Sequence, residues 1–297
     1  MSRPIGLVFT LLAVTAVAFA ANDDLRAVAV TQLRTLAQPL FERGESTDPH
    51  FDAFYAGMVE ELPPQARAER ALELTINRHQ GAAEYVMKTA QSWRRQIEPT
   101  PALTSLITTA MNAPRLEIRM AAYEVHLAQF DLDKTPEQVD RLLARLRDDP
   151  RGSGPWALWS MAVIGARGVD RERVFNELMM ATRIDDEYVR RWAVDALAKF
   201  GGVEVIDPLL ELAAHDPSAL IQERAFCGLA QSGTLHIAER YHALPGLLAI
   251  VENPQSNKQT RDWSYQALRE ISGLYAVAEK TEAWRDALTA SGLLQIR

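Results

Sequence analysis

The side chains that could do chemistry in this sequence are six histidines and one cysteine, since both residue types bind metals or exchange protons near neutral pH. The histidines are His50, His79, His126, His215, His236 and His242. No two of them have the His-x-x-x-His spacing of a helical zinc site, and no His-Glu pair occurs. Cys227 has no second cysteine with which to form a disulfide, so a buried apolar thiol is expected there. The sequence therefore predicts no metal site.

Motifs of catalysis and of phosphate binding are missing as well. Neither Gly-x-Ser-x-Gly, which presents a nucleophilic serine, nor a glycine-rich phosphate loop occurs. The glycine-containing stretch over residues 165–168 is too short for such a loop and falls where a helical hairpin needs its turn. His236 and His242 flank Glu239 and Arg240 in an insertion that we interpret as a surface loop rather than a catalytic site. We expect a protein without enzymatic activity and without a cofactor.

Three tryptophans recur at equivalent positions of the chain. Trp156, Trp192 and Trp263 each stand directly before a small residue of an apolar helix face. A row of rings at regular spacing can bind glycans or peptides by stacking. Because this position adjoins the apolar face, we favour the interpretation that the rings fill space between stacked helices.

The elements that carry these residues are clearest over residues 189–216, which predict two helices joined by a glycine turn. The first helix face has apolar residues at i, i+3, i+4, i+7, i+8 and i+11, namely Val189, Trp192, Ala193, Ala196, Leu197 and Phe200. Gly201 and Gly202 then end this helix. Pro208 leaves two interpretations of the second helix, either a kink or a start with Asp207 as N-cap and Pro208 at the first helical position. A pair this small cannot bury its apolar face alone, so neighbours of the same kind are predicted.

The same helix pair recurs along the chain. The first-helix trio Ala193, Ala196 and Leu197 is matched by four others: Ala122, Val125 and His126 in a degraded form, then Ala157, Ser160 and Met161, then Ala225, Gly228 and Leu229, then Ser264, Ala267 and Leu268. Equivalent second-helix positions follow one another at intervals of 36, 36, 31 and 38 residues, at Leu103, Val139, Phe175, Ile206 and Leu244. A helix-turn-helix unit of about 36 residues is typical of solenoids, so the predicted fold class is all-α, an α-solenoid of stacked helix pairs.

Two strings in this array resemble HEAT repeats, in particular the short variety of phycocyanobilin lyases. They are VRRWAVDALAKFGGVEVIDPLLELAAHDP over residues 189–217 and TRDWSYQALREISG over residues 260–273. The resemblance is good over residues 115–273 and weak before them. Tetratricopeptide repeats have a similar period, but their glycine and tyrosine positions are missing here.

The resemblance implies an armadillo/HEAT-type superhelix, which is commonly a scaffold for protein or peptide binding. The alternative function that it implies is a bilin-lyase-like or other enzyme built on such a solenoid. Predicted export argues against that alternative, because bilin attachment belongs with cytoplasmic phycobiliproteins.

The N-terminal residues predict export. Residues 1–20 contain Arg3, an apolar run and then Ala18-Phe19-Ala20, the pattern of a cleaved secretory signal peptide. The alternative is an uncleaved membrane anchor, but the apolar run is shorter than the roughly 20 residues of a spanning helix. We therefore expect export by the Sec route, a periplasmic or secreted location, and no stable membrane span after cleavage.

The chain divides into four predicted segments. A signal peptide over residues 1–20 is followed by an N-terminal helical cap over 21–62, with helices over about 23–41 and from Phe51. A repeat array covers residues 63–273 and is clearest over 115–273, and a C-terminal capping helix lies within 274–297, with Thr281 able to cap it. The alternative for the N-terminal segment is a separate interaction module.

A binding surface is predicted on the second helices, on the side opposite to their apolar residues. The side chains expected there are Asp140, Arg141, Asn176, Met180, Asp207, Glu211 and His242. Their mixed charge suits a protein or peptide partner, whereas the net charge of −7 and the absence of a basic stripe argue against nucleic acid. An ordinary solvated face is the alternative interpretation of the same residues.

Overall fold

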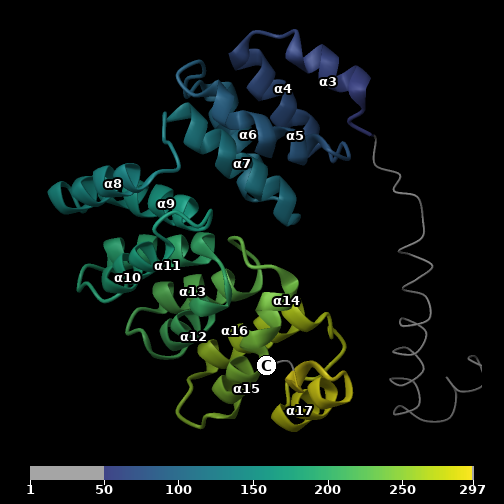
Figure 1. Cartoon of the computed structure of the whole chain (residues 1–297). Helices are drawn as coiled ribbons and strands as arrows, with labels where there is room; N and C mark the ends of the chain where they lie inside the picture. Colours follow the sequence, from purple (N-terminus) through teal and green to yellow (C-terminus); the bar gives the residue numbers. More distant parts are fainter. Residues whose placement is uncertain (1–49, 296–297) are drawn as a thin grey trace, which may run out of the picture. The chain divides into compact units, whose positions relative to one another are not determined.

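Stacked helices make up the part of the chain that the computed structural model describes, residues 50–295 (Figure 1). The α-helices are α3 (Ala53–Glu60), α4 (Pro64–Ile76), α5 (Ala82–Thr89), α6 (Pro101–Met111), α7 (Leu116–Gln129), α8 (Pro136–Asp148), α9 (Gly154–Gly165), α10 (Arg171–Ala181), α11 (Glu187–Phe200), α12 (Ile206–His215), α13 (Ala219–Ala230), α14 (Ile237–Arg240), α15 (Leu244–Glu252), α16 (Lys258–Ser272) and α17 (Thr281–Ala290). The short 3-10 helices are η1 (Ala90–Trp93), η2 (Val203–Val205), η3 (Tyr241–Ala243) and η4 (Leu293–Gln295). Within residues 50–295, extended pairing amounts to one isolated bridge between His50 and Gln80. The predicted all-α solenoid is confirmed.

Local sequence signals determine where several helices begin. The hydroxyl groups of Thr100 and Thr135 each accept a hydrogen bond from the main-chain N–H three residues later, and a proline occupies the first turn of α6 and α8. The carboxylate of Asp186 does the same for two N–H groups at the start of α11. These caps satisfy donors that have no partner within the helix.

The first helices of the repeat units, α9, α11, α13 and α16, pack side by side. Small residues allow this: a methyl group added to Gly228 of α13 would lie 3.1 Å from the Cβ atom of Ala198 on α11. Each second helix packs against the first helix that follows it, α8 on α9, α12 on α13 and α15 on α16. The first-helix residues of the clear repeats are buried in the repeat core, as in Ala157, Ala193 and Ala225, whereas Ala122 and Val125 of the degraded copy are buried in the core of α3 to α7.

Helix α7 is buried on all its faces over most of its length. Its residues from Ile118 to Ala128 are buried except for the half-buried Met120. Ala121 and Val125 belong to the hydrophobic core of α3 to α6, whereas Tyr123 and Leu127 belong to the core of the repeat units. The buried charged side chains of this helix, Arg119 and Glu124, therefore need partners within the chain. α7 packs mainly against α5 and α6 rather than forming a hairpin with α8.

One of the two interpretations at Pro208 and the predicted cap at Thr281 are wrong in detail. Asp207 is not an N-cap, because α12 follows η2 directly and begins at Ile206, with Pro208 as its third residue. Proline is tolerated there since the N–H groups of the first helical turn have no partner within the helix. Thr281 is the first residue of α17 and makes no capping hydrogen bond, since Lys280 takes the N-cap position.

The insertion that includes α14 and η3 is more than the surface loop predicted from the sequence. Arg240 within it is only 4% exposed. Its guanidinium donates hydrogen bonds to main-chain oxygens of Gly228, Leu229, Ser232 and Leu235. These carbonyls belong to the last turn of α13 and the residues after it, where helical oxygens lack partners. Arg240 therefore ends α13 by binding its carbonyl groups.

Some predicted segments lie outside residues 50–295. They are the signal peptide over residues 1–20, the helix over about 23–41, and the last two residues. α3 is the described portion of the predicted N-terminal cap. At the other end, Trp284 and Leu288 of α17 are fully buried against the repeat core. Among helices of residues 50–295, none combines the length and hydrophobicity needed to cross a membrane.

Candidate functional site

The surface predicted to bind a partner is formed by six side chains on second helices and one on the 3-10 helix before α15, and we call these seven the second-helix row. The row consists of Asp140 and Arg141 on α8, Asn176 and Met180 on α10, Asp207 and Glu211 on α12, and His242 on η3. His242 is half-buried, and the other six are exposed. Met180 has 55% of its surface exposed, although it is a large apolar side chain. Helical periodicity thus placed these residues correctly outside the core.

Ion pairs join neighbouring second helices beside this row. Arg173 of α10 lies 2.6 Å from the carboxylate of Asp140 on α8. Arg171 of α10 lies 2.6 Å from the carboxylate of Glu204 on η2, before α12. Exposed ion pairs contribute only about 0.2–1 kcal/mol each to the free energy of unfolding. Their effect is to hold the charged side chains of adjacent repeats in fixed positions.

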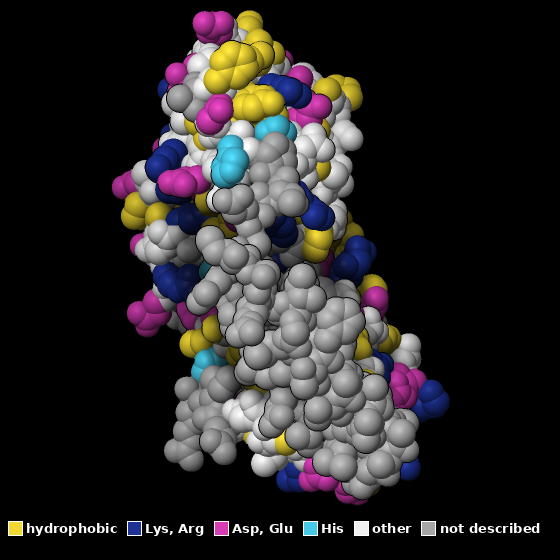
Figure 2. Space-filling view, turned by 90° about the vertical axis from the view of Figure 1, so that its right-hand side faces the viewer, with side chains coloured by type: hydrophobic (Ala, Val, Ile, Leu, Met, Phe, Trp, Pro, Cys, Tyr) yellow, Lys and Arg dark blue, Asp and Glu magenta, His cyan; other side chains and the backbone are white. Residues whose placement is uncertain are grey.

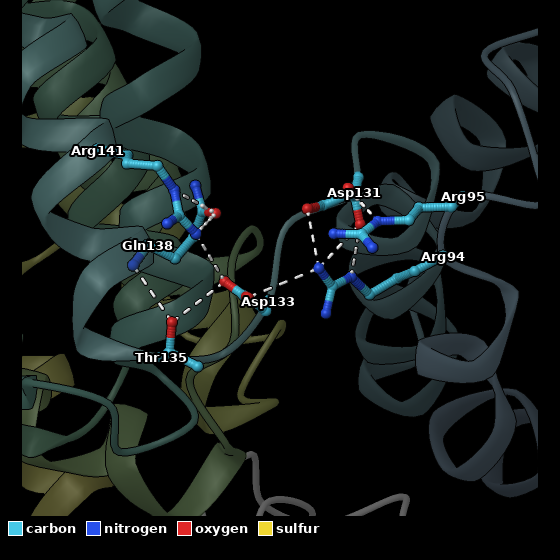
Figure 3. A network of polar contacts seen from close by, with 7 residues as sticks. All are labelled: Arg94, Arg95, Asp131, Asp133, Thr135, Gln138 and Arg141. Carbon is cyan, nitrogen blue, oxygen red and sulfur yellow. Dashed lines mark hydrogen bonds and ion pairs between the residues drawn. The ribbon is translucent and has the colours of Figure 1, made fainter.

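Arg141 is occupied by contacts within its own chain. Its Nη2 atom lies 2.7 Å from the amide oxygen of Gln138 and 3.1 Å from a carboxylate oxygen of Asp133 (Figure 3). Thr135 completes this part of the network by accepting a hydrogen bond from the N–H of Gln138. Asn176, Met180 and Asp207, in contrast, make no side-chain hydrogen bond or ion pair with other residues of the described range. These three residues are therefore better placed than Arg141 to contact a partner.

The same network reaches back to the segment after η1. Arg94 lies 2.8 Å from Asp131 and 3.6 Å from Asp133, and Arg95 lies 2.8 Å from Asp131 (Figure 3). The hydrogen bond from Arg95 is the main cause that lowers the pKa of Asp131, and Arg94 lowers it further. Asp131 has a φ of 52°, a left-handed conformation that aspartate tolerates better than most residues. The network ties the connection between α7 and α8 to the α3–α7 region.

The recurring tryptophans are partly buried and pack against the repeat core, which confirms the packing interpretation of Trp156, Trp192 and Trp263. The indole nitrogens of Trp156 and Trp192 are buried without a hydrogen-bond partner. The guanidinium of Arg145 lies 4.9 Å from the centre of the Trp156 ring, covering that ring from outside. Arg145 therefore occupies one face of the Trp156 ring.

An aromatic cluster joins α7 to α9. The ring of His126 lies 4.3 Å from that of Trp159 and 4.9 Å from that of Phe130, measured between ring centres. Burial lowers the pKa of His126 to about 3, and its Nε2 atom has no hydrogen-bond partner. Lys199 of α11 lies on the far side of this cluster, 5.8 Å from the centre of the Trp159 ring, and burial lowers its pKa too. His126 is thus a neutral packing residue at ordinary pH.

A buried carboxylate on α7 was not predicted from the sequence. Glu124 of α7 is 3% exposed, and its two oxygens bind Arg167 at 2.7 Å and Lys134 at 2.9 Å. Arg119, one turn earlier on α7, donates a hydrogen bond to the main-chain oxygen of Gly233 at 2.9 Å. Arg167 is 43 residues from Glu124 in sequence, and Gly233 is 114 residues from Arg119. Contacts between residues this far apart produce no periodic pattern in the sequence, so they could not be predicted from it.

Two depressions lie on the surface of the described residues. One, of about 490 Å³, is mainly apolar and lies among α3, α4 and α6. The other, of about 500 Å³, is polar and lies at the start of α10, where Arg171, Arg173 and Asn176 line it. The second depression includes one member of the second-helix row, and its arginines are already paired with carboxylates.

Metal-ligating side chains are dispersed in residues 50–295, where no group of three or more His, Cys, Asp or Glu residues could hold a metal ion. Cys227 is half-buried and unpaired within this range, and burial raises the pKa of its thiol. A raised pKa leaves the thiol protonated and unreactive near neutral pH.

Comparison with known proteins gives one positive result. No curated protein matches the sequence. A family model described as HEAT repeats matches residues 151–230, which include the helices from α9 to α13. This stretch contains Trp156 and Trp192, the glycine turn at Gly201 and the tightly packed pair of α11 and α13. By this match, the chain carries HEAT repeats over residues 151–230.

Proposed function

We propose that this chain is an exported, non-enzymatic HEAT-repeat scaffold that binds a protein or a peptide along the second-helix row. The observation that carries the proposal is the composition of that row, where an exposed apolar side chain, Met180, lies among charged and amide groups on successive helices. Repeat solenoids commonly use such extended surfaces to hold a partner.

The chemistry of the row suits a peptide or protein surface. Methionine adapts its shape to different apolar side chains, which is useful at a binding surface. Asp207 and Glu211 can bind basic groups of a partner, and Asn176 can both donate and accept hydrogen bonds. A polyanion would need uniform positive charge, which the row lacks.

The charged groups around the row support a scaffold rather than a catalyst. Asp140, Glu177 and Glu204 are each engaged by an arginine of the neighbouring helix. Each of these carboxylates is therefore engaged within the chain, whereas a general acid or base must be free to exchange a proton with a substrate.

Export rests on the sequence of residues 1–20, and it has a direct test. Intact mass or Edman degradation of the protein from an envelope fraction is expected to show a chain that begins at Ala21. A mass that includes residues 1–20 would favour the anchored alternative and refute cleavage.

Binding along the row is tested with a pull-down from envelope extract, followed by affinity measurement with the captured partner. Met180→Asp and the double change Asp207→Lys and Glu211→Lys are expected to weaken binding at least roughly tenfold, since each removes or reverses a contact at the centre of the surface. Ile237→Asp is the matched control, because Ile237 is 53% exposed but lies on α14, outside the row.

All these variants are expected to melt within about 2 °C of the wild type, because exposed side chains add little stability. Unchanged affinity in both row variants, or an equal loss in Ile237→Asp, would refute the assignment of the surface.

A further inference from the structure

An apolar groove lies at the α3 end of the described helices and shares no residue with the second-helix row. Its apolar lining residues are Tyr55, Met58, Val59, Leu62, Ala66, Leu74 and Leu106. Its volume of about 490 Å³ lies within the range of roughly 300–1,000 Å³ that is usual for binding pockets. Met58 in this lining is 52% exposed, and Phe54, next to the lining residue Tyr55 in sequence, is 70% exposed. Figure 2 shows hydrophobic side chains gathered at this end of the molecule.

Carboxylates border the groove and outnumber the cations that could neutralise them. Glu69 and Glu73 of α4 line one edge. Glu60 and Glu61 lie at the end of α3, between the lining residues Val59 and Leu62 in sequence. Glu69 is held in place by the amide of Gln65 at 2.8 Å and by the hydroxyl of Thr100 at 3.0 Å, both of them neutral groups.

The arginines near this edge are already engaged. Arg70 lies 2.6 Å from the carboxylate of Glu73, the pair that neutralises one acidic residue. Arg67 instead donates hydrogen bonds to the main-chain oxygens of Glu60 and Leu62, closing the turn between α3 and α4. Within residues 50–295, the carboxylates of Glu60, Glu61 and Glu69 therefore have no ion-pair partner.

We propose that this groove binds an amphipathic helix of a partner protein that carries lysine or arginine beside its apolar residues. The apolar side chains of the partner helix would enter the groove, and its cations would meet the unpaired carboxylates. Glu69 and Glu73 lie one helical turn apart on α4 and both line the groove, and Glu69 is the one of the two that has no ion-pair partner, so negative charge lies along one edge of the apolar lining. A line of charge beside a strip of apolar surface matches a helix better than a small molecule, which would need polar groups on several sides.

The experiment uses the full chain and two synthetic peptides of about 18 residues, long enough to hold helical structure. Both have leucines at i, i+3, i+4 and i+7, and the remaining positions are lysine-rich in one peptide and glutamate-rich in the other. Fluorescence anisotropy measures their affinities. The lysine peptide is expected to bind at least roughly tenfold more tightly than the glutamate peptide, and the preference is expected to shrink as salt rises.

Two variants locate the binding site. Met58→Asp is expected to weaken binding of the lysine peptide at least roughly tenfold, although it adds a negative charge that would strengthen nonspecific attraction. Met180→Asp is the matched control, with the same change at a methionine of similar exposure on α10, and it is expected to leave peptide affinity unchanged. Comparing the two variants also distinguishes binding in this groove from binding along the second-helix row, because Met180→Asp is expected to disrupt only the row.

Several outcomes would overturn the proposal. They are equal affinity for the two peptides, no binding of either peptide, and wild-type affinity in Met58→Asp. Analytical ultracentrifugation adds one more: a dimer of the wild type that Met58→Asp dissociates would show that a second copy of the chain occupies the groove. Circular dichroism and thermal melting confirm that both variants are folded.

Discussion

Acidification is expected to destabilise this protein through His126 in particular. The side chain is buried between Trp159 and Phe130, and burial lowers its pKa from the ordinary value of 6.5 to about 3. The folded protein therefore keeps His126 neutral at pH 5, whereas the unfolded chain binds a proton there. Because the folded pKa is the lower one, stability is complete above pH 6.5 and is lost as the pH falls from about 6.5 towards 3.

The size of the effect follows from the two pKa values. Between the two pKa values, each pH unit below the unfolded pKa lowers the free energy of unfolding by about 1.4 kcal/mol. The expected loss from His126 alone is about 2 kcal/mol at pH 5, a large fraction of the roughly 5–15 kcal/mol that stabilises most domains.

The assay is urea denaturation of the wild type and of His126→Leu at pH 7.5 and pH 5.0. His126→Leu keeps a side chain of similar size but cannot take a proton, so its loss of stability between the two pH values should be smaller by about 2 kcal/mol. Equal pH dependence of the wild type and His126→Leu, or an NMR titration of His126 near pH 6.5, would refute this reasoning.

Four further predictions follow from the packing and charges. Trp192→Ala is expected to lower the free energy of unfolding, measured by urea denaturation, by about 3 kcal/mol. This value is at the lower end of the range for large aromatic side chains cut to alanine, because the Trp192 ring is only partly buried. Glu124→Gln should lower the free energy of unfolding by about 3 kcal/mol, because Arg167 and Lys134 lose their buried carboxylate partner. Glu177→Gln, which breaks the pair with the exposed Arg147, should lower it by less than about 1 kcal/mol. Equal losses in the two variants would contradict this prediction. Gly233→Ala should lower the melting temperature, since the added methyl group would overlap the main-chain oxygen of Ala198 at a φ of 76°, while Gly168→Ala meets open space and has only the cost of its φ of 87°. A chelator should leave the melting temperature unchanged because the sequence has no paired metal-ligand spacing, and a clear drop would reveal a metal site.

Much of the fold could be predicted because its signals are local. The hydroxyl groups of Thr100 and Thr135 and the prolines after them mark helix starts within a few residues. The burial of Ala193 and Ala196 follows from a period of 3.6 residues, and so does the exposure of Asn176 and Met180 on the opposite side of their helix. Repetition strengthened each signal, because the same pattern occurs several times.

The features that could not be predicted depend on contacts between distant residues. The ion pair of Arg167 with Glu124 becomes visible only once α7 lies against the end of α9. Arg141 appeared free on its helix face, but the turn before α8 brings Asp133 within 3.1 Å of it. Phe54 and Met58 have the spacing of an apolar helix face, and periodicity alone could not tell that this face remains largely exposed.

The burial of α7 on all its faces limits how such a chain can change in length during evolution. Repeat arrays grow when a helix pair is duplicated, because each pair presents the same faces to both neighbours. α7 presents one face to the core of α3 to α6 and another to the repeat core, so a second copy beside it would find no matching surface. Because the pairs from α8 to α16 repeat one pattern, duplication or loss of a unit is expected among them rather than at α7.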